Sequence, residues 1–323
     1  MTEHRAPWWA DLPPATGAAV MATGTLSVGL RLTGFPVLSL VAFGLATAVW
    51  LFLAWGFAAL FLRHRDHWRG KAGTPPALTA VAATTVLGVR CALLGAVPLA
   101  AALLLLAAVL WPGLLVPVLR RLPRRAPGAM FLLCVATQGL AVLAAVLAPA
   151  VGGRLARPAL AAFVLGLVLY AVVLARFDLR QVVTGAGDHW IAGGALAISA
   201  LAGAELLASG AWSGGAATVL RAADFVLLAL ALAWYAVLLC GEFVRPRPVY
   251  DVRRWSTVFP LAMTAVAALA TARAATVPWL GTLGHVLLWI AVAAWFPAAY
   301  GLCRTLPRPP SRAGRRPERR QKP

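Results

Sequence analysis

Charged residues are scarce in this chain of 323 residues, at 12%, whereas about a quarter of the residues in a typical soluble domain are charged. Hydrophobic residues make up 61% of the chain. So little charge excludes an ordinary water-soluble domain. The solvent for most of this chain must be the hydrocarbon of a lipid bilayer.

Cysteine, histidine and acidic residues are also few, and none occurs in a pattern that chemistry requires. The four cysteines each stand alone in an apolar stretch, without CxxC or Cys/His spacing. The five histidines and ten acidic residues form no set with the spacing of metal ligands or of a catalytic cluster. The sequence therefore predicts no catalytic residue, metal or cofactor, so an enzyme is disfavoured, while a purely structural membrane subunit stays open.

Long apolar runs, interrupted by Arg, Pro and Gly, recur along the chain and predict an all-α integral membrane protein. About 20 apolar residues at 1.5 Å each cross a hydrocarbon core roughly 30 Å thick. We predict a transport domain over residues 15–303, between a cytoplasmic N-terminus at 1–14 and a basic, disordered cytoplasmic tail at 304–323. Its ten helices, forming five hairpins, are predicted at 15–32, 37–62, 77–97, 99–119, 128–147, 158–174, 188–207, 222–240, 255–272 and 277–303.

Basic residues give the orientation of these helices. An even number of helices places both termini on one side, and Lys and Arg accumulate in cytoplasmic loops. We predict a multi-pass protein of the bacterial inner membrane with both termini in the cytoplasm. The net charge of +19 then reflects topology and contact with anionic lipids at the cytoplasmic face, and no nucleic-acid partner is expected. Six basic residues would lie on the outer side: Arg31, Arg90, Arg154, Arg157, Arg221 and Arg273.

Aromatic residues divide unevenly between alternate helices. The five odd-numbered predicted helices contain four aromatics, whereas the five even-numbered ones contain seventeen. Bulky aromatics suit contact with lipid, and small residues let helix backbones approach one another or leave an open lumen. We therefore predict an inner pore ring of odd helices surrounded by an outer ring of even helices. Tight packing in a solid bundle is the alternative.

Few charges lie at membrane depth, and three of them fall on odd helices near the outer side. Arg31, Arg90 and Glu205 could form a positively charged vestibule that concentrates anions, with Glu205 paired to one of the arginines. Snorkelling of the side chains to the lipid headgroups is the alternative, especially for Arg31.

Deeper positions on the odd helices carry only small or neutral groups. A neutral lumen lined by hydroxyls can pass an anion without trapping it, because permeation requires weak binding. No chain of carboxylates suggests a proton relay. The predicted pore-lining residues are Thr23, Gly24, Thr25, Ser27, Thr84, Thr85, Thr137, Gln138, Gly194, Ser199 and Thr264.

Three of the odd helices carry short motifs. The first reads MATGTLS over Met21–Ser27, the seventh reads GDHWIAGGALAIS over Gly187–Ser199, and the ninth has Trp255 followed by Phe259-Pro260. Together they resemble the tellurite-resistance and dicarboxylate transporter family, which includes plant slow-type anion channels, fungal malate permeases and sulfite exporters. Ala22 stands where that family has glycine in the first motif.

The resemblance implies a homotrimer in which each protomer has its own pore, formed by the five odd helices and blocked by a phenylalanine. Carried over to this sequence, that gate is Phe259, and Pro260 beside it can bend the helix and direct the ring toward the axis. Without the resemblance, Phe259 would be a packed aromatic beside a kink.

The transported species is expected to be a small anion of the chloride, nitrate, sulfite or malate class. An anion channel or permease is favoured, and an ion-coupled carrier or exporter of dicarboxylates or of oxyanions such as tellurite and sulfite is the alternative.

Overall fold

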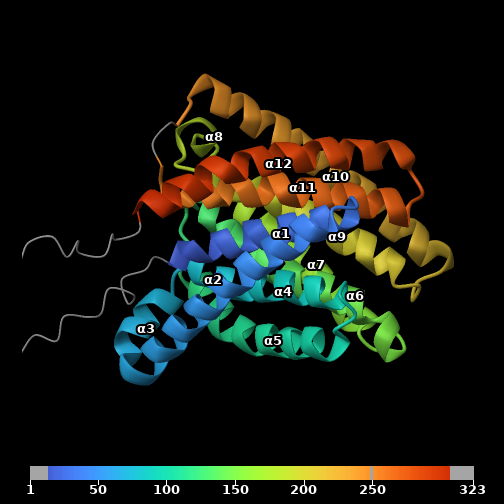
Figure 1. Cartoon of the computed structure of the whole chain (residues 1–323), viewed down its shortest axis with the longest axis horizontal. Coiled ribbons are helices and arrows are strands. Elements are labelled where there is room, and N and C mark those ends of the chain that lie inside the picture. The colour runs from blue at the N-terminus through green and yellow to red at the C-terminus, as the bar shows by residue number, and fades with distance from the viewer. Residues whose placement is uncertain (1–13, 248–249, 306–323) are drawn as a thin grey trace, which may run out of the picture.

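The computed structural model describes residues 14–247 and 250–305, which form a bundle of helices (Figure 1). The predicted terminal segments, 1–14 and 304–323, lie almost entirely outside the described residues. The α-helices are α1 Gly17–Leu32, α2 Pro36–Arg63, α3 Arg65–Ala72, α4 Thr79–Ala92, α5 Val97–Arg120, α6 Leu132–Leu147, α7 Ala156–Leu174, α8 Gln181–Thr184, α9 Ile191–Ala208, α10 Gly214–Val244, α11 Trp255–Ala274 and α12 Pro278–Thr305.

Five helices form a closed inner ring. α1 packs against α4 and α11, α4 packs against α6, α6 against α9, and α9 against α11, which completes the circle. These helices correspond to the odd-numbered predicted helices. Each is preceded directly by a 3-10 turn, namely Pro14–Thr16, Pro75–Leu78, Gly128–Phe131, Asp188–Trp190 and Val252–Arg254.

The other long helices cover this ring. α2, α5, α7, α10 and α12 each pack against the inner helix that precedes them in the chain. In the most apolar stretch of each span, 83 to 94% of the residues are buried for α6, α9 and α11, but only 11 to 33% for the five covering helices. Aromatic-rich helices thus face outward, in agreement with the division seen in the sequence.

The all-α membrane class is confirmed, while the ten-span hairpin arrangement stays a prediction. Within the described residues, eight helices are long and apolar enough to cross a membrane, or nine if the bent pair Arg65–Ala72 and Pro75–Ala92 is one span. α1 is apolar but has only 16 residues. The described chain begins and ends at the same end of the bundle as α3 (Figure 1).

Several helix bounds differ from the predicted ones. The helix predicted at 77–97 ends at Ala92, because the chain turns at Gly95, whose φ of +79° is one that glycine adopts readily. α10 is longer than predicted and runs over Gly214–Val244, since its first turns continue through the small residues before Arg221. α3 and α8 are short helices in the loops and were not predicted.

Hydrogen bonds from tryptophan to threonine join the covering helices to the inner ring. In each of three pairs, an indole N–H donates to a threonine hydroxyl at 2.9 to 3.0 Å. Hydrocarbon offers no water to an unpaired indole N–H, so each bond removes the cost of an unsatisfied donor. The pairs are Trp50 of α2 with Thr84 of α4, Trp111 of α5 with Thr137 of α6, and Trp295 of α12 with Thr23 of α1.

The beginnings of α6 and α9 approach each other closely at Gly128. A Cβ placed on Gly128 would lie 2.5 Å from the carbonyl oxygen of Asp188 and 2.5 Å from the nitrogen of His189. Both are backbone atoms and cannot move aside as a side chain would. The amide of Gly128 also donates to Oε1 of Gln181 at 3.1 Å, which fixes this turn against the α8 segment.

Gly128→Ala should therefore destabilise the protein by about 1–3 kcal/mol through overpacking, seen as a lower midpoint of thermal unfolding in detergent. The matched control is Gly113→Ala, because a Cβ on this exposed position of α5 meets nothing within 4 Å. That change should leave stability unaltered or raise it by up to about 1 kcal/mol. Equal effects of the two substitutions would contradict the close approach.

The Trp111–Thr137 bond can be measured with a double-mutant cycle. Trp111→Phe and Thr137→Val should show a coupling free energy of about 0.6 kcal/mol, with an upper bound of about 1.7 kcal/mol, when unfolding is followed in detergent. A pair without a bond, such as Trp111→Phe with Thr23→Val, should be additive. If both pairs were additive, the indole hydrogen bond would contribute nothing to the free energy of unfolding.

Candidate functional site

A cavity of about 110 Å³ lies where the five inner helices begin. Each of these helices contributes residues from its first turn or from the 3-10 turn before it, and the cavity extends to Phe259 on α11. Since all five helices start at this end, they run parallel, and their N-termini converge on one space. We call it the inner cavity.

Helix N-termini carry partial positive charge, equivalent to roughly half an elementary charge each, together with N–H groups that lack intrahelical partners. Five of them around one cavity favour an anion there. Hydroxyl groups of Thr79 and Ser256 belong to the same lining.

Two charged side chains also line the inner cavity, and each has partners. Asp188 accepts a hydrogen bond through Oδ2 from the amide of Ala129, at 3.2 Å. Arg253 donates through Nε and Nη2 to the carboxylate of Asp251, at 3.0 and 2.8 Å. These bonds hold the pKa of the Asp251 carboxyl below its usual value, so the pair stays ionised at neutral pH.

A second cavity lies further along the ring, toward the other end of the inner helices. Its volume is about 20 Å³, enough for roughly one water-sized particle. All five inner helices line it, mostly with Val, Ile, Leu and Met, and its hydroxyls are those of Thr25 and Thr85. We call it the outer cavity.

The two hydroxyls of the outer cavity differ in what they bind. Thr85 donates to the carbonyl of Ala82 at 2.9 Å. The hydroxyl of Thr25 is buried, with the residue 1% exposed, and has no hydrogen-bond partner among the described residues. A buried hydroxyl without a partner is costly, and a particle in the cavity would remove that cost.

Phe259 stands between the two cavities. It lines the inner cavity, while Met263, one turn further along α11, lines the outer one. The order is the same on α1, where Met21 lines the inner cavity and Thr25, one turn further, lines the outer one. Four residues of helix span about 6 Å, so roughly one turn of packed side chains separates the cavities. Phe259 is only 1% exposed, so its side chain is packed on all sides at this level.

The Phe259 ring lies against the backbone of α9 at Gly194. A Cβ placed on Gly194 would be 3.2 Å from Cε1 of Phe259 and 2.8 Å from Cγ of Pro260. Pro260 has no N–H, so one hydrogen bond of the α11 ladder is missing beside the ring. Thr264 donates its hydroxyl to the carbonyl of Pro260 at 2.8 Å and stabilises the same turn.

Several predicted pore-lining residues face the covering helices instead of the cavities. Thr23, Thr84 and Thr137 accept the tryptophan bonds described above. Gln138 of α6 donates to the carbonyl of Phe163 in α7, at 3.0 Å. These bonds direct the four polar side chains toward the covering helices and away from the two cavities.

The other predicted residues also make contacts within the bundle. A Cβ on Gly24 would meet Cγ1 of Val86 at 2.8 Å, so this glycine permits the close approach of α1 and α4. Ser199 donates to the carbonyl of Ala195 at 2.7 Å, within its own helix. Of the predicted set, Thr25, Thr85 and Phe259 line the cavities directly.

The three residues of the predicted vestibule are not brought together by direct bonds in the described chain. Arg31 is exposed, and Glu205 interacts electrostatically with Arg273 rather than with Arg31 or Arg90. Arg90 is 1% exposed and donates through Nε to the hydroxyls of Ser27 and Ser39, both at 3.1 Å.

The guanidinium of Arg90 also lies over the ring of Phe43, at 5.6 Å from its centroid. Its Nη1 has no hydrogen-bond partner among the described residues. The next residue back in α4, Val89, lines the outer cavity. Within the described residues, Arg90 is thus a buried positive charge with no carboxylate bonded to it, and its head group points toward α2.

Sequence reasoning did not assign the residues at the helix beginnings to a cavity, and of these Thr79, Asp188, Arg253 and Ser256 are polar. The predicted topology could have indicated this cavity, because consecutive hairpins make alternate helices parallel and bring their N-termini to one end of the bundle. In the part of the chain that the structure describes, no group of three or more His, Cys, Asp or Glu could hold a metal ion.

The comparisons with known proteins agree with this architecture. The family model SLAC1, described as voltage-dependent anion channel, matches residues 11–303, which include the five inner helices and all but the last two residues of the covering helices. No curated protein matches the chain. Members of this family are anion channels or transporters, and the resemblance drawn from the three sequence motifs is confirmed. The chain therefore belongs to the SLAC1 family of voltage-dependent anion channels and is a multi-pass membrane protein.

Proposed function

We propose that this protein is an anion channel of the bacterial inner membrane, with both termini in the cytoplasm, that passes small anions through the ring of five inner helices. The anions are of the chloride, nitrate, sulfite or malate class, and Phe259 is the gate. The observation that carries the proposal is the pair of cavities on the ring, both lined by all five inner helices and separated at Phe259.

Entry from the cytoplasm begins at the inner cavity. Five helix N-termini raise the local concentration of anions there, and the hydroxyls of Thr79 and Ser256 stand in the same lining. Arg253 is already paired with Asp251, so Asp188 leaves one negative side chain in the lining, and the partial positive charge of the five helix N-termini opposes it. An anion that enters meets the Phe259 ring, which offers neither space nor a polar partner.

Passage requires the Phe259 ring to leave the axis. Pro260 interrupts the hydrogen-bond ladder beside the ring, so α11 deforms more easily at this turn than elsewhere. Beyond the gate, the hydroxyl of Thr25 donates to the anion in the outer cavity, and the charge of Arg90 lowers the cost of its dehydration. The apolar remainder of the lining keeps binding weak, which allows release.

At the outer end, Arg31 and Arg90 supply positive charge and Glu205 opposes it. The functional unit is a homotrimer, as in the family that the motifs resemble, with one pore in each protomer and anionic lipids around the cytoplasmic face. An ion-coupled carrier is the second candidate, favoured by the closed state of the ring.

Phe259→Ala should convert a small anion current into one at least tenfold larger in planar bilayers or liposomes, because it removes the ring between the cavities. Phe163→Ala is the matched control: Phe163 is equally buried, at 3% exposed, but lies on α7 outside the ring. It should lose stability without gaining conductance.

The same experiment separates the candidate functions. Saturable uptake linked to protons or sodium, without conductance in either Phe259 protein, would establish a carrier and overturn the channel. Absence of flux from all correctly inserted variants would leave a structural subunit. Equal currents in wild type and Phe259→Ala would remove the gate from the proposal.

Glu205→Gln should raise anion conductance about twofold, because a unit charge acting through water over about 10 Å contributes roughly 0.4 kcal/mol. The effect should shrink as ionic strength rises. Asp66→Asn is the control, since this carboxylate is almost fully exposed on α3, at the other end of the bundle. Unchanged conductance in Glu205→Gln would show that the charge of Glu205 does not affect the entry of anions at the outer end.

A further inference from the structure

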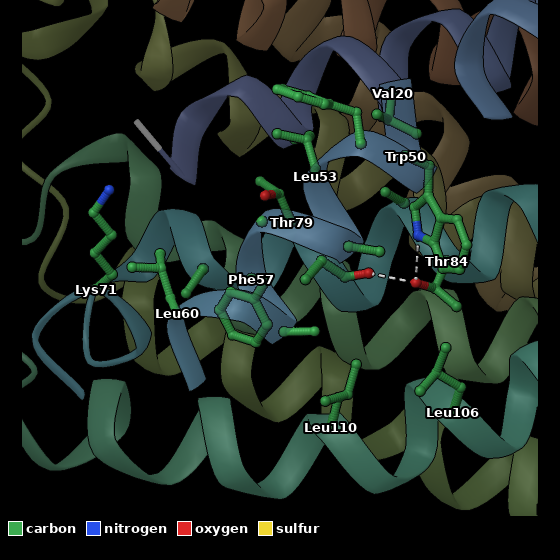
Figure 2. A pocket seen from close by; sticks show the side chains of 18 residues that line it. Val20, Trp50, Leu53, Phe57, Leu60, Lys71, Thr79, Thr84, Leu106 and Leu110 are labelled. Atoms are coloured by element: carbon green, nitrogen blue, oxygen red, sulfur yellow. Dashed lines mark hydrogen bonds between the residues drawn. The ribbon is translucent and has the colours of Figure 1, made fainter. Parts of the chain in front are cut away.

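A groove of about 270 Å³ opens on the outside of the bundle, between α2 and α5 (Figure 2). Its floor is α4, and α1 contributes Gly17 and Val20 at one side. The groove does not belong to the candidate ion pathway. It lies in the outer layer of the bundle, where two covering helices, α2 and α5, flank the inner helix α4.

The groove has an apolar interior. α2 lines one wall with Leu53, Phe57 and Leu60, and α5 lines the other with Leu106 and Leu110 (Figure 2). The polar groups on its floor are already satisfied within the protein. The indole of Trp50 donates to Thr84, and Thr84 donates in turn to the carbonyl of Ala80, at 2.7 Å. Such a lining suits a hydrocarbon chain.

The length of the groove matches one leaflet of a bilayer. Its wall on α2 runs from Trp50 to Leu60, ten residues along the helix, which is about 15 Å. Half of a hydrocarbon core roughly 30 Å thick is also about 15 Å. One acyl chain, lying along α2, would therefore reach from the headgroup level to the bilayer midplane.

Positive charge marks one end of the groove. Lys71 of α3 belongs to the lining, and Figure 2 shows its amine at the end away from Trp50 and Thr84. Arg121, which follows α5, is close by, since a Cβ on Gly73 would lie 2.9 Å from its Nη1. A phosphate at this end would meet two cations and stand at the level where α2 ends.

We propose that this groove is a binding site for one anionic phospholipid, which places an acyl chain between α2 and α5 and its phosphate against Lys71 and Arg121. The charge at one end and the match in length together distinguish the site from the general lipid coat. The proposal is independent of the ion that the protein carries.

The site also touches the wall of the ion pathway. Thr79 lines both the groove and the inner cavity, and Gly17 of α1 packs directly against it. A lipid chain in the groove therefore contacts the same α1–α4 seam that closes one side of the inner cavity.

The test is native mass spectrometry of the full-length, delipidated protein in detergent, titrated with phosphatidylglycerol or with phosphatidylcholine carrying identical acyl chains. We expect phosphatidylglycerol to bind at least tenfold more tightly. Lys71→Gln should abolish that preference, while Arg63→Gln, an exposed cation at the end of α2 that does not line the groove, should keep it.

A second pair of variants tests the chain rather than the headgroup. Ala80→Phe should fill the groove and reduce tight binding of phosphatidylglycerol by at least tenfold, whereas Ala108→Phe on the exposed side of α5 should not. Equal binding of the two lipids to the wild type would overturn the proposal. So would an Ala80→Phe protein that keeps its lipid but loses its oligomeric state, because the groove would then be a subunit interface.

Discussion

The requirement that polar groups be satisfied inside the protein determines how this ring is built. In hydrocarbon there is no water to bond an indole N–H or a threonine hydroxyl, so these groups pair across helices. Three tryptophans of covering helices reach three threonines of the inner ring, and Gln138 reaches the backbone of α7. Several polar residues of the inner helices are therefore used to hold the outer layer in place.

One consequence concerns the path itself. With their hydroxyls turned outward, the inner helices present Val, Leu, Ile and Met to the outer cavity, where Thr25 and Thr85 supply the hydroxyls. The strongest attraction for an anion then comes from the backbone, through the five parallel N-termini around the inner cavity. In the proposed path, side chains close the passage, while the parallel helix directions supply the positive field.

The sequence predicted the layers well, because lipid contact selects aromatics and helix contact selects small residues over whole spans. It predicted the orientation of single side chains poorly. Thr84 and Thr85 are adjacent and chemically identical, yet one bonds Trp50 and the other lines the outer cavity. The two threonines differ only in whether a partner on another helix lies within reach, and the position of that partner depends on tertiary packing. Likewise, Arg90 was recognised as a costly charge, but its serine partners could not be read from a single helix.

The different orientations of neighbouring residues in one helix limit which mutations that helix can accept during evolution. Neighbouring positions on α4 serve two different surfaces, so an added or lost residue within that helix would rotate everything beyond it by about 100°. The outward threonine and the inward one would both leave their surfaces at once. Substitutions in such helices are therefore tolerated one at a time, whereas insertions and deletions belong in the loops.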